Sequence, residues 1–273
     1  MAKSIEEVQA IARRVRRDIV EMITAAKSGH PGGSLSAVEI LVELYFNTMR
    51  IDPANPKWVD RDRFILSKGH AAPVLYSVMA ERGYPDTPRE KLNTLRQFGS
   101  VFQGHPDMRF IPSLEASTGS LGQGLSLGLG MALGARLDGR ASRTYVMVGD
   151  GEIQEGQIWE AAMSAAFHKA DNLVVIVDYN HIQLDGFVKD IMEVEPLADK
   201  WRAFGWEVIE IDGHDAAAVR GASARAAATK GKPSCVLAHT VKGKGVSFME
   251  NNPKFHGMAP TQDELKLALQ ELN

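Results

Sequence analysis

Length, composition and charge describe an ordinary folded chain. The 273 residues are 44% hydrophobic and 24% charged, which excludes wholesale disorder and fibrous repeats. Thirty-one basic residues against 34 acidic ones give a net charge of -3, so no positive field exists to hold nucleic acid non-specifically. A single cysteine, Cys235, excludes an intramolecular disulfide and a cysteine-rich zinc site, and it favours a cytoplasmic location.

The first half of the chain is predicted to be mostly helix and loop. Ser4 and Glu7 have the spacing of a capping box, and apolar residues then recur at helical intervals up to Gly29. Further helical patterns cover roughly 34–46, 71–82, 88–97 and 121–137, all before any convincing strand. The most apolar stretch, 121–135, contains five glycines and is shorter than the roughly 20 residues that span a bilayer, so we expect no membrane segment.

The second half alternates between strand and helix patterns. Short β-rich runs at 144–150, 172–180, 206–212 and 234–240 are separated by helical segments near 153–168, 196–204 and 215–229. This order predicts an α/β fold, a parallel sheet with crossover helices, in which ligands bind beyond the carboxyl ends of the strands.

The chain has no internal repeat and no linker-like segment, so we treat residues 1–273 as a single domain. Its helical part covers about 1–140, its βαβ part about 141–260 and its last helix 261–270.

The strongest candidate site is the segment GDGEIQEG at 149–156, at the end of the first of these strands. Gly149 and Gly151 allow a tight turn, and the helix that follows directs its positive N-terminal end toward a diphosphate. Asp150 and Asn180 end two successive strands, and together with the Ile182 carbonyl they would offer oxygen ligands to Mg²⁺. The alternative is an N-cap aspartate and an unrelated Asx turn.

Histidines form a second set of candidates, because four of the eight directly follow a glycine. An imidazole presented from a turn can bind a ligand or carry a proton near neutral pH. We expect such roles for His30, His70 and His105, and a purely structural role for His214 in its DGHD turn.

The motifs together resemble those of transketolases. GDG, a gap of just under thirty residues and a terminal Asn are similar to the thiamine diphosphate motif. SGHPGG at 28–33, SKGH at 67–70, GHPD at 104–107 and TGSLGQG at 118–124 resemble the transketolase N-terminal domain in order and spacing. The resemblance covers almost the whole chain and implies the thiamine diphosphate-binding fold.

This resemblance implies a role for each matching residue. His70 would contact the cofactor diphosphate, while His30, His105 and His256 would line the sugar channel and aid proton transfer. His256, in FHG at 255–257, is equally compatible with a surface loop.

The remaining implied residues belong to the cofactor. Gly122 would lie against its pyrimidine ring and Glu155 at a subunit interface, while Gly149, Asp150, Gly151 and Asn180 hold the diphosphate. The metal, bound by Asp150, Asn180 and Ile182, would be Mg²⁺ or another divalent cation such as Ca²⁺ or Mn²⁺.

Catalysis in this superfamily also needs a glutamate that touches the aminopyrimidine, carried by a second α/β domain that this sequence does not contain. The resemblance therefore implies the N-terminal subunit of a split transketolase, active on sugar phosphates with a C-terminal subunit that carries the pyrimidine-binding domain. A heterotetramer with two copies of each chain is expected. The alternatives are a component of another thiamine diphosphate enzyme, of synthase or 2-oxo acid dehydrogenase type, and a non-catalytic subunit that keeps the fold.

Two further signals predict little. The glycines of GLGMALG follow no strand, so they favour close helix packing over a dinucleotide site. Lys242 and Lys244 in VKGKG lack phosphate-loop spacing and either cover a ligand or solvate a loop.

Overall fold

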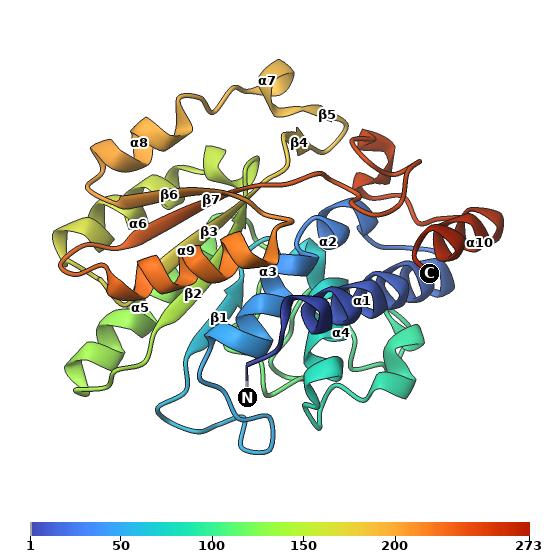
Figure 1. Ribbon diagram of the computed structural model, residues 1–273, viewed down its shortest axis with the longest axis horizontal. Helices are drawn as coiled ribbons and strands as arrows, with labels where there is room; N and C mark the ends of the chain where they lie inside the picture. Colours follow the sequence, from blue (N-terminus) through green and yellow to red (C-terminus); the bar gives the residue numbers. More distant parts are fainter. Residues whose placement is uncertain (1) are drawn as a thin grey trace.

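The computed structural model describes residues 2–273 and has a five-stranded parallel sheet at its centre (Figure 1). The strand order is β1-β2-β3-β7-β6, and every neighbouring pair is parallel. A short antiparallel hairpin, β4-β5, follows β3. The strands are β1 (Arg63–Leu66), β2 (Thr144–Gly149), β3 (Leu173–Tyr179), β4 (Ile182–Gln183), β5 (Gly186–Phe187), β6 (Glu207–Asp212) and β7 (Ser234–His239).

Helices cover both faces of this sheet, which confirms the predicted α/β fold. The α-helices are α1 (Ile5–Ala26), α2 (Pro31–Leu35), α3 (Val38–Glu43), α4 (Ala72–Arg82), α5 (Gln123–Leu137), α6 (Gly156–Phe167), α7 (Val188–Ile191), α8 (Leu197–Ala203), α9 (Ala216–Ala228) and α10 (Gln262–Glu271). A π-helical turn, η1 (Leu44–Thr48), and 3₁₀ turns, η2 (Gly69–Ala71), η3 (Arg89–Thr94), η4 (Glu152–Gln154) and η5 (Pro253–His256), complete the secondary structure.

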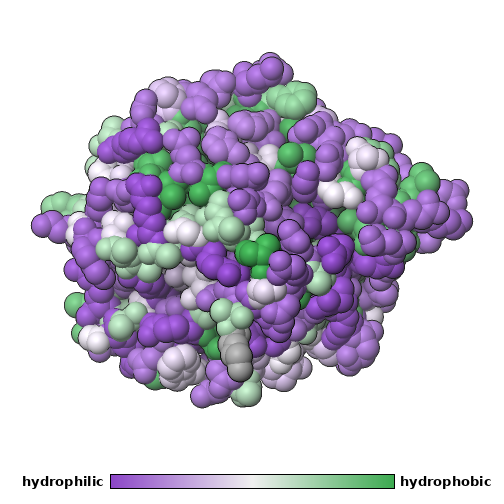
Figure 2. Space-filling view, in the orientation of Figure 1, coloured by the Kyte–Doolittle hydropathy of each residue, from purple (hydrophilic) through white to green (hydrophobic). Residues whose placement is uncertain are grey.

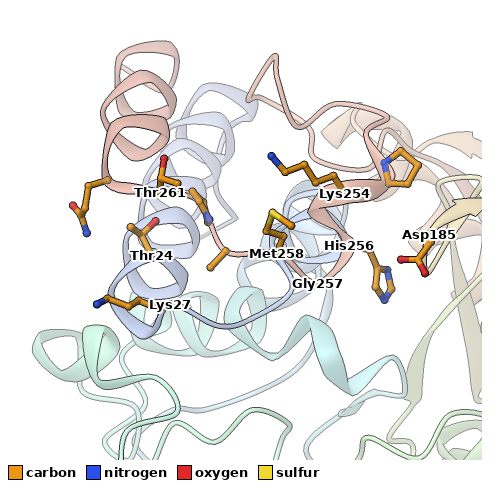
Figure 3. A pocket seen from close by; sticks show the side chains of 12 residues that line it. Thr24, Lys27, Asp185, Lys254, His256, Gly257, Met258 and Thr261 are labelled. Atoms are coloured by element: carbon orange, nitrogen blue, oxygen red, sulfur yellow. The ribbon is translucent and has the colours of Figure 1, made fainter.

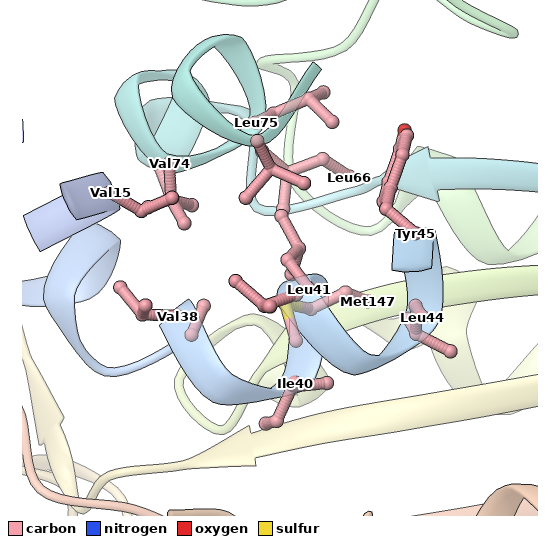
Figure 4. Packing of buried hydrophobic residues seen from close by; sticks show 14 of the residues in the cluster. Val15, Val38, Ile40, Leu41, Leu44, Tyr45, Leu66, Val74, Leu75 and Met147 are labelled. Atoms are coloured by element: carbon pink, nitrogen blue, oxygen red, sulfur yellow. The ribbon is translucent and has the colours of Figure 1, made fainter. Parts of the chain in front are cut away.

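Alternate residues of the central strands enter two separate hydrophobic layers. Tyr145 and Met147 of β2 pack into the layer that contains α1, α3, α4 and α9, whereas Val146 and Val148 pack into the layer with α5, α6 and α8. Figure 4 shows Met147 next to Leu41 of α3, with Leu75 of α4 above them. Because both faces are buried, the strand reads as a continuous apolar run.

Strand β1 differs from the sequence-based expectation, which placed no strand before residue 143. Its four residues form the edge of the sheet and pair with β2 from Arg63–Thr144 to Leu66–Met147. A strand this short shows no alternation that distinguishes it from a loop, so only its tertiary pairing defines it. The largely helical first half of the chain therefore also contributes to the sheet.

Two expected helices in the first half are shorter than predicted. The segment 34–46 is divided into α2, α3 and η1, with a break at Ser36 and Ala37. The segment 88–97 forms only the 3₁₀ turn η3, in which Leu92 is buried and its neighbours reach the surface. With Leu95 just after the turn, the segment has two buried side chains, and these form too small an apolar face to stabilise an α-helix there.

Other local predictions are confirmed. Ser4 and Glu7 form both hydrogen bonds of the capping box that starts α1. Along α5, a Cβ at Gly128 would clash with the Val146 side chain of β2, so this glycine allows close helix–sheet packing. A Cβ at Gly130 would meet no atom within 4 Å.

No helix within the described residues 2–273 is both long enough and apolar enough to cross a membrane. Hydrophilic residues cover most of the face shown in Figure 2, and hydrophobic residues form small groups between them.

Candidate functional site

Most of the predicted site residues surround one pocket at the carboxyl edge of the sheet. Strands β2 and β3 lie side by side with Gly149 opposite Asp178, so the loops that leave them start at the same place. The pocket has a volume of about 320 Å³. The predicted residues that line it are His70, Gly149, Asp150, Gly151, Glu155, Asn180, Ile182 and His256.

Three of these residues bring oxygen atoms to the pocket. Asp150 is 2% exposed and accepts hydrogen bonds from the backbone N–H groups of Gly151 (2.8 Å) and His181. The Asn180 amide nitrogen donates to Asp178 at 2.9 Å, and its oxygen accepts from the Ile182 N–H at 3.2 Å. The Ile182 carbonyl faces the pocket, where it accepts from Lys242 at 2.7 Å.

These oxygen atoms fit a hard divalent cation completed by ligand and water oxygens. A carboxylate, an amide and a backbone carbonyl suit Mg²⁺, which binds few protein ligands and retains several waters. No group of three or more His, Cys, Asp or Glu side chains within residues 2–273 is arranged to hold a metal. The oxygen set at Asp150, Asn180 and Ile182 differs from such a cluster because it contains only one carboxylate.

An unpartnered donor also faces this pocket. The side-chain nitrogen of Gln183 is buried, and no group among the described residues accepts its hydrogen bond. A Cβ at Gly151 would lie 2.7 Å from the Gln183 Cβ, so glycine is needed where this side chain packs. A buried amide without a partner is costly, and an acceptor such as a phosphate oxygen would satisfy it. Sequence reasoning missed Gln183, because it belongs to no recognisable motif.

Asp178 organises the polar groups behind the pocket. It is fully buried and accepts hydrogen bonds from Ser36 (2.7 Å), Asn180 (2.9 Å), Thr240 and Lys68. Burial by itself raises the pKa of this carboxyl, but the Lys68 ammonium and the hydrogen bonds outweigh burial, and the net pKa is lowered. Asp178 thus holds the metal-ligand candidate Asn180 and the pocket residue Lys68 in one network.

Lys242 is the second lysine that lines the pocket, whereas Lys244 of the same VKGKG segment does not line it. The Lys242 side chain is 2% exposed and donates to the Ile182 carbonyl and to His256 Nδ1 at 2.9 Å, whereas Lys244 reaches the surface beside Glu250. Burial and Lys68 lower the pKa of Lys242, while burial and Asp178 raise the pKa of Asp150. Both shifts are expected for buried charged groups. A bound anion would raise the pKa of Lys242 again, and a bound cation would lower the pKa of Asp150 again.

Three histidine rings from distant segments meet at the mouth of the pocket. The ring centroids of His30, His70 and His256 lie 5.2 to 5.4 Å apart. Burial lowers the pKa of His30 to about 4 and that of His256 to about 3, and it lowers the pKa of His70 well below its usual range. All three rings are therefore neutral at pH 7, so each offers one donor and one acceptor.

His105 lies near this cluster but outside the pocket. Its exposed ring packs on the backbone of Gly119, and burial together with Arg96 lowers its pKa. Arg96 donates to Ser28 at 2.9 Å and lies 3.5 Å from His30 Nδ1. Sequence reasoning missed Arg96, because it stands in no recognisable motif, and it gave no role to Ser28 although this residue begins SGHPGG.

Gly122 and Glu155 lie at one side of the pocket. Gly122 has a φ of 84° as the N-cap of α5, and a Cβ there would lie 2.8 Å from Glu155 Cβ. Glu155 is exposed. The glycine therefore provides both a left-handed backbone and close contact between the two loops.

His214 has the structural role expected of it, and it supports the loop that carries Lys242. Its Nδ1 lies 3.0 Å from Glu39, and its Nε2 accepts from the Val241 N–H at 2.8 Å. Although burial by itself raises the pKa of Glu39, Arg16 and His214 hold it at about 2. Arg16 also donates to the Lys244 carbonyl at 2.9 Å.

A larger cavity of about 660 Å³ adjoins the histidine cluster at His256. Figure 3 shows Thr24 of α1 directly below Thr261 at one side of this cavity, with Met258 and Gly257 between them and His256. His256 lines both cavities, so it lies inside the site and not on a surface loop apart from it.

Comparison with known proteins gives one consistent family. The model of the transketolase thiamine diphosphate binding domain matches residues 7–273. The chain is 46% identical to the 6-deoxy-6-sulfo-D-fructose transketolase subunit SqwG of Clostridium sp., covering 100% of this chain and 98% of that protein. It is 43% identical to one subunit of the apulose-4-phosphate transketolase of Actinobacillus succinogenes, covering 98% of this chain and 97% of that protein.

Solved transketolase structures share the fold. The transketolase of Campylobacter jejuni superposes with a TM-score of 0.94 at 33% identity, covering 99% of this chain and 43% of that one. The Pichia stipitis enzyme in complex with sedoheptulose 7-phosphate gives a TM-score of 0.92 at 33% identity, over 97% and 40%. The present chain thus spans about two fifths of the length of these solved transketolases.

Proposed function

The chain belongs to the transketolase family, and relatives that match it over nearly their whole length are transketolase subunits, so we propose that it is the N-terminal subunit of a two-chain transketolase. With its partner it transfers a two-carbon ketol unit from a ketose to an aldose. The observation that carries this proposal is one pocket lined by two buried lysines, Asp150, Asn180, the unpartnered Gln183 and two neutral histidines, with the His30 ring packed against both histidines.

The inner part of the pocket would hold the diphosphate and its metal ion. Asp150, Asn180 and the Ile182 carbonyl would bind Mg²⁺, with Ca²⁺ or Mn²⁺ as substitutes. Lys242 and His70 would contact the diphosphate oxygens, since an ammonium and a neutral imidazole are good donors to phosphate. When bound, thiamine diphosphate supplies the nucleophilic carbon that makes ketol transfer possible.

The other histidines, His30, His105 and His256, would handle the sugar. His30 is neutral and can donate to one hydroxyl while accepting from another. His256 Nδ1 already accepts from Lys242, so this ring offers its Nε2–H as a donor to the sugar. His105 would act from the outer side, next to Arg96. The sugars named for the two relatives carry a sulfo group or a phosphate, and we propose ketoses with a charged end for this chain as well.

The partner would contribute the pyrimidine-binding domain and its activating glutamate, with two copies of each chain in the complex. Exposed apolar side chains on α5 and α6, Leu127, Leu137, Met163 and Phe167, support such an assembly, because surfaces of this kind are commonly buried between subunits. The single buried Cys235 supports a cytoplasmic location.

The test is reconstitution. The purified chain with thiamine diphosphate and Mg²⁺ should not transfer ketol units from fructose 6-phosphate, 6-deoxy-6-sulfo-D-fructose or apulose 4-phosphate to an aldose acceptor. Addition of the subunit that carries the pyrimidine-binding domain should produce activity with at least one of them. Robust turnover by the isolated chain would contradict the two-chain proposal, and a stable but inactive complex would favour a non-catalytic subunit.

A further inference from the structure

Glu152 is a buried acid of the cofactor loop for which the proposed chemistry has no use. It follows the Gly149–Gly151 turn directly and is 3% exposed. A negative side chain next to a diphosphate pocket opposes binding of the anion by charge alone. Its presence there therefore calls for another explanation.

Three donors from three separate segments satisfy this carboxylate. The Gly122 N–H donates to Oε1 at 2.9 Å, and the Gly149 N–H donates to Oε2 at 3.0 Å. The Ser67 hydroxyl also donates to Oε1. Ser67 Oγ in turn accepts from the Gly124 N–H at 3.1 Å, so the network extends into the first turn of α5.

Each of these segments carries groups that form the pocket. Ser67 precedes Lys68 and His70, Gly122 follows Leu121, and Gly149 precedes Asp150. Ser67 lies 85 residues from Glu152 along the chain and Gly122 lies 30 residues from it, so no local backbone pattern fixes their relative positions. The Glu152 carboxylate is the group that all three segments contact.

The chemistry of the contact requires a carboxylate. Both oxygens act only as acceptors, and every partner is a donor. A glutamine would turn its NH₂ group toward one of these donors and lose at least one hydrogen bond while keeping nearly the same volume.

We infer that Glu152 is a positioning residue, which fixes the loops at 67–70, 121–124 and 149–151 so that their pocket groups face the cofactor. The inference rests on the proposed cofactor function, but its first consequence concerns the cofactor-free chain. The Gly122 and Gly149 amides both donate to Glu152, and these hydrogen bonds protect the amides from solvent exchange while the carboxylate is in place.

The experiment compares Glu152→Gln with Glu160→Gln, an exposed glutamate on α6 outside the pocket. Amide hydrogen exchange of the cofactor-free full chain should accelerate about tenfold or more in the peptides that contain Gly122 and Gly149 of Glu152→Gln. The Kd for thiamine diphosphate with Mg²⁺ should rise about tenfold or more. With the partner and saturating cofactor, kcat and the KM for the sugar should stay within about twofold of wild type.

Ser67→Ala provides a second variant that keeps the carboxylate and removes one donor. Its Kd should rise by a smaller factor, about threefold, and it decides the question if Glu152→Gln does not fold. Wild-type exchange and wild-type cofactor affinity in folded Glu152→Gln would overturn the inference, as would equal losses in Glu160→Gln. Wild-type protein that binds no thiamine diphosphate would instead refute the proposed function, while the exchange result would still decide the role of Glu152.

Discussion

At the residue scale, four of the most deeply buried charged side chains of the protein lie around one pocket. Asp150, Asp178, Lys68 and Lys242 are each at most 2% exposed. Buried ions cost free energy unless they are paired and hydrogen-bonded, and Asp178 meets that condition with four donors. Asp150 is bound only by two backbone N–H groups, and its pKa is raised. A bound cation would therefore stabilise the charged form of Asp150 more than that of Asp178.

Substitution of the metal-ligand candidates tests this directly. Asp150→Ala should abolish Mg²⁺-supported binding of thiamine diphosphate, because the site loses its only carboxylate, and Asn180→Ala should weaken it. The free energy of unfolding without cofactor should change by about 1 kcal/mol or less in Asp150→Ala, since relief of charge burial offsets two lost hydrogen bonds. Calorimetric titration measures the affinity, with exposed Asp190→Ala as control. Undiminished affinity in both variants would refute the metal site.

Substitutions of His70 and His105 should affect different properties of the reconstituted enzyme. His70 lines the pocket and His105 lies outside it, so His70→Ala should mainly raise the cofactor concentration for half-maximal activity of the reconstituted enzyme. His105→Ala should lower kcat/KM for the sugar and leave the cofactor requirement near wild type, because its contact is made only with the substrate. Activity measured against cofactor concentration decides it. Rescue of His105→Ala by excess cofactor, but not of His70→Ala, would reverse the two assignments.

At the element scale, the pocket exists because loops from both halves of the chain approach one another closely. A Cβ at Gly32 would lie 2.9 Å from the Phe255 carbonyl, and one at Gly69 would lie 2.8 Å from the Gly119 nitrogen. The SGHPGG segment therefore touches the segment of His256, and SKGH touches TGSLGQG. The Gly243 N–H also donates to the Gly32 carbonyl at 3.0 Å, which joins the Lys242 loop to the same group.

Two glycines of α5 provide a matched test of helix–sheet packing. Gly128→Ala should lower the free energy of unfolding by about 1–3 kcal/mol, because the new methyl group clashes with buried, β-branched Val146 of a central strand. Gly130→Ala should be neutral or stabilising by about 0.5–1 kcal/mol, because its Cβ meets no described atom and alanine favours a helix. Urea unfolding of the isolated chain measures both. Equal changes would show that α5 does not pack on β2 as described.

At the scale of the whole molecule, the buried histidines couple stability to pH. The pKa of His30, about 4, lies below that of an unfolded histidine, about 6.5, so the unfolded chain binds the proton more readily between these values. Stability rises with pH wherever the unfolded state binds more protons, so His30 destabilises the fold as pH falls from 6.5 toward 4 and has no such effect above 6.5. Asp18, whose pKa burial raises to about 6, contributes in the opposite direction.

A difference measurement isolates the histidine. When the pH falls from 7 to 4, the free energy of unfolding of the wild type should decrease by up to about 2 kcal/mol more than that of His30→Gln. The reason is that the variant lacks one histidine that takes up a proton on unfolding. Urea unfolding at several pH values gives the comparison, and exposed His168→Gln should follow the wild-type profile. Parallel profiles for His30→Gln and wild type would show that His30 is not buried as the ring cluster implies.

The sequence alone determined the family, the strands β2, β3, β6 and β7, and half of the residues that line the pocket. It did so because these features depend on local information: apolar runs, glycine spacing and motif order. The transketolase resemblance is confirmed by the family match over 7–273 and by relatives that are transketolase subunits.

Only the tertiary structure decided how the pocket is built. Gln183 carries no local signal, and the VKGKG pattern left the role of Lys242 open. Both become pocket residues because β7 and the β4-β5 hairpin end beside β3. The pairing of β1 with β2, the meeting of His30, His70 and His256, and the contact of Glu152 with Ser67 and Gly122 all join segments far apart in the chain. Burial and pKa shifts arise from these long-range contacts, so they are properties of the folded packing and are not encoded in any short stretch of sequence.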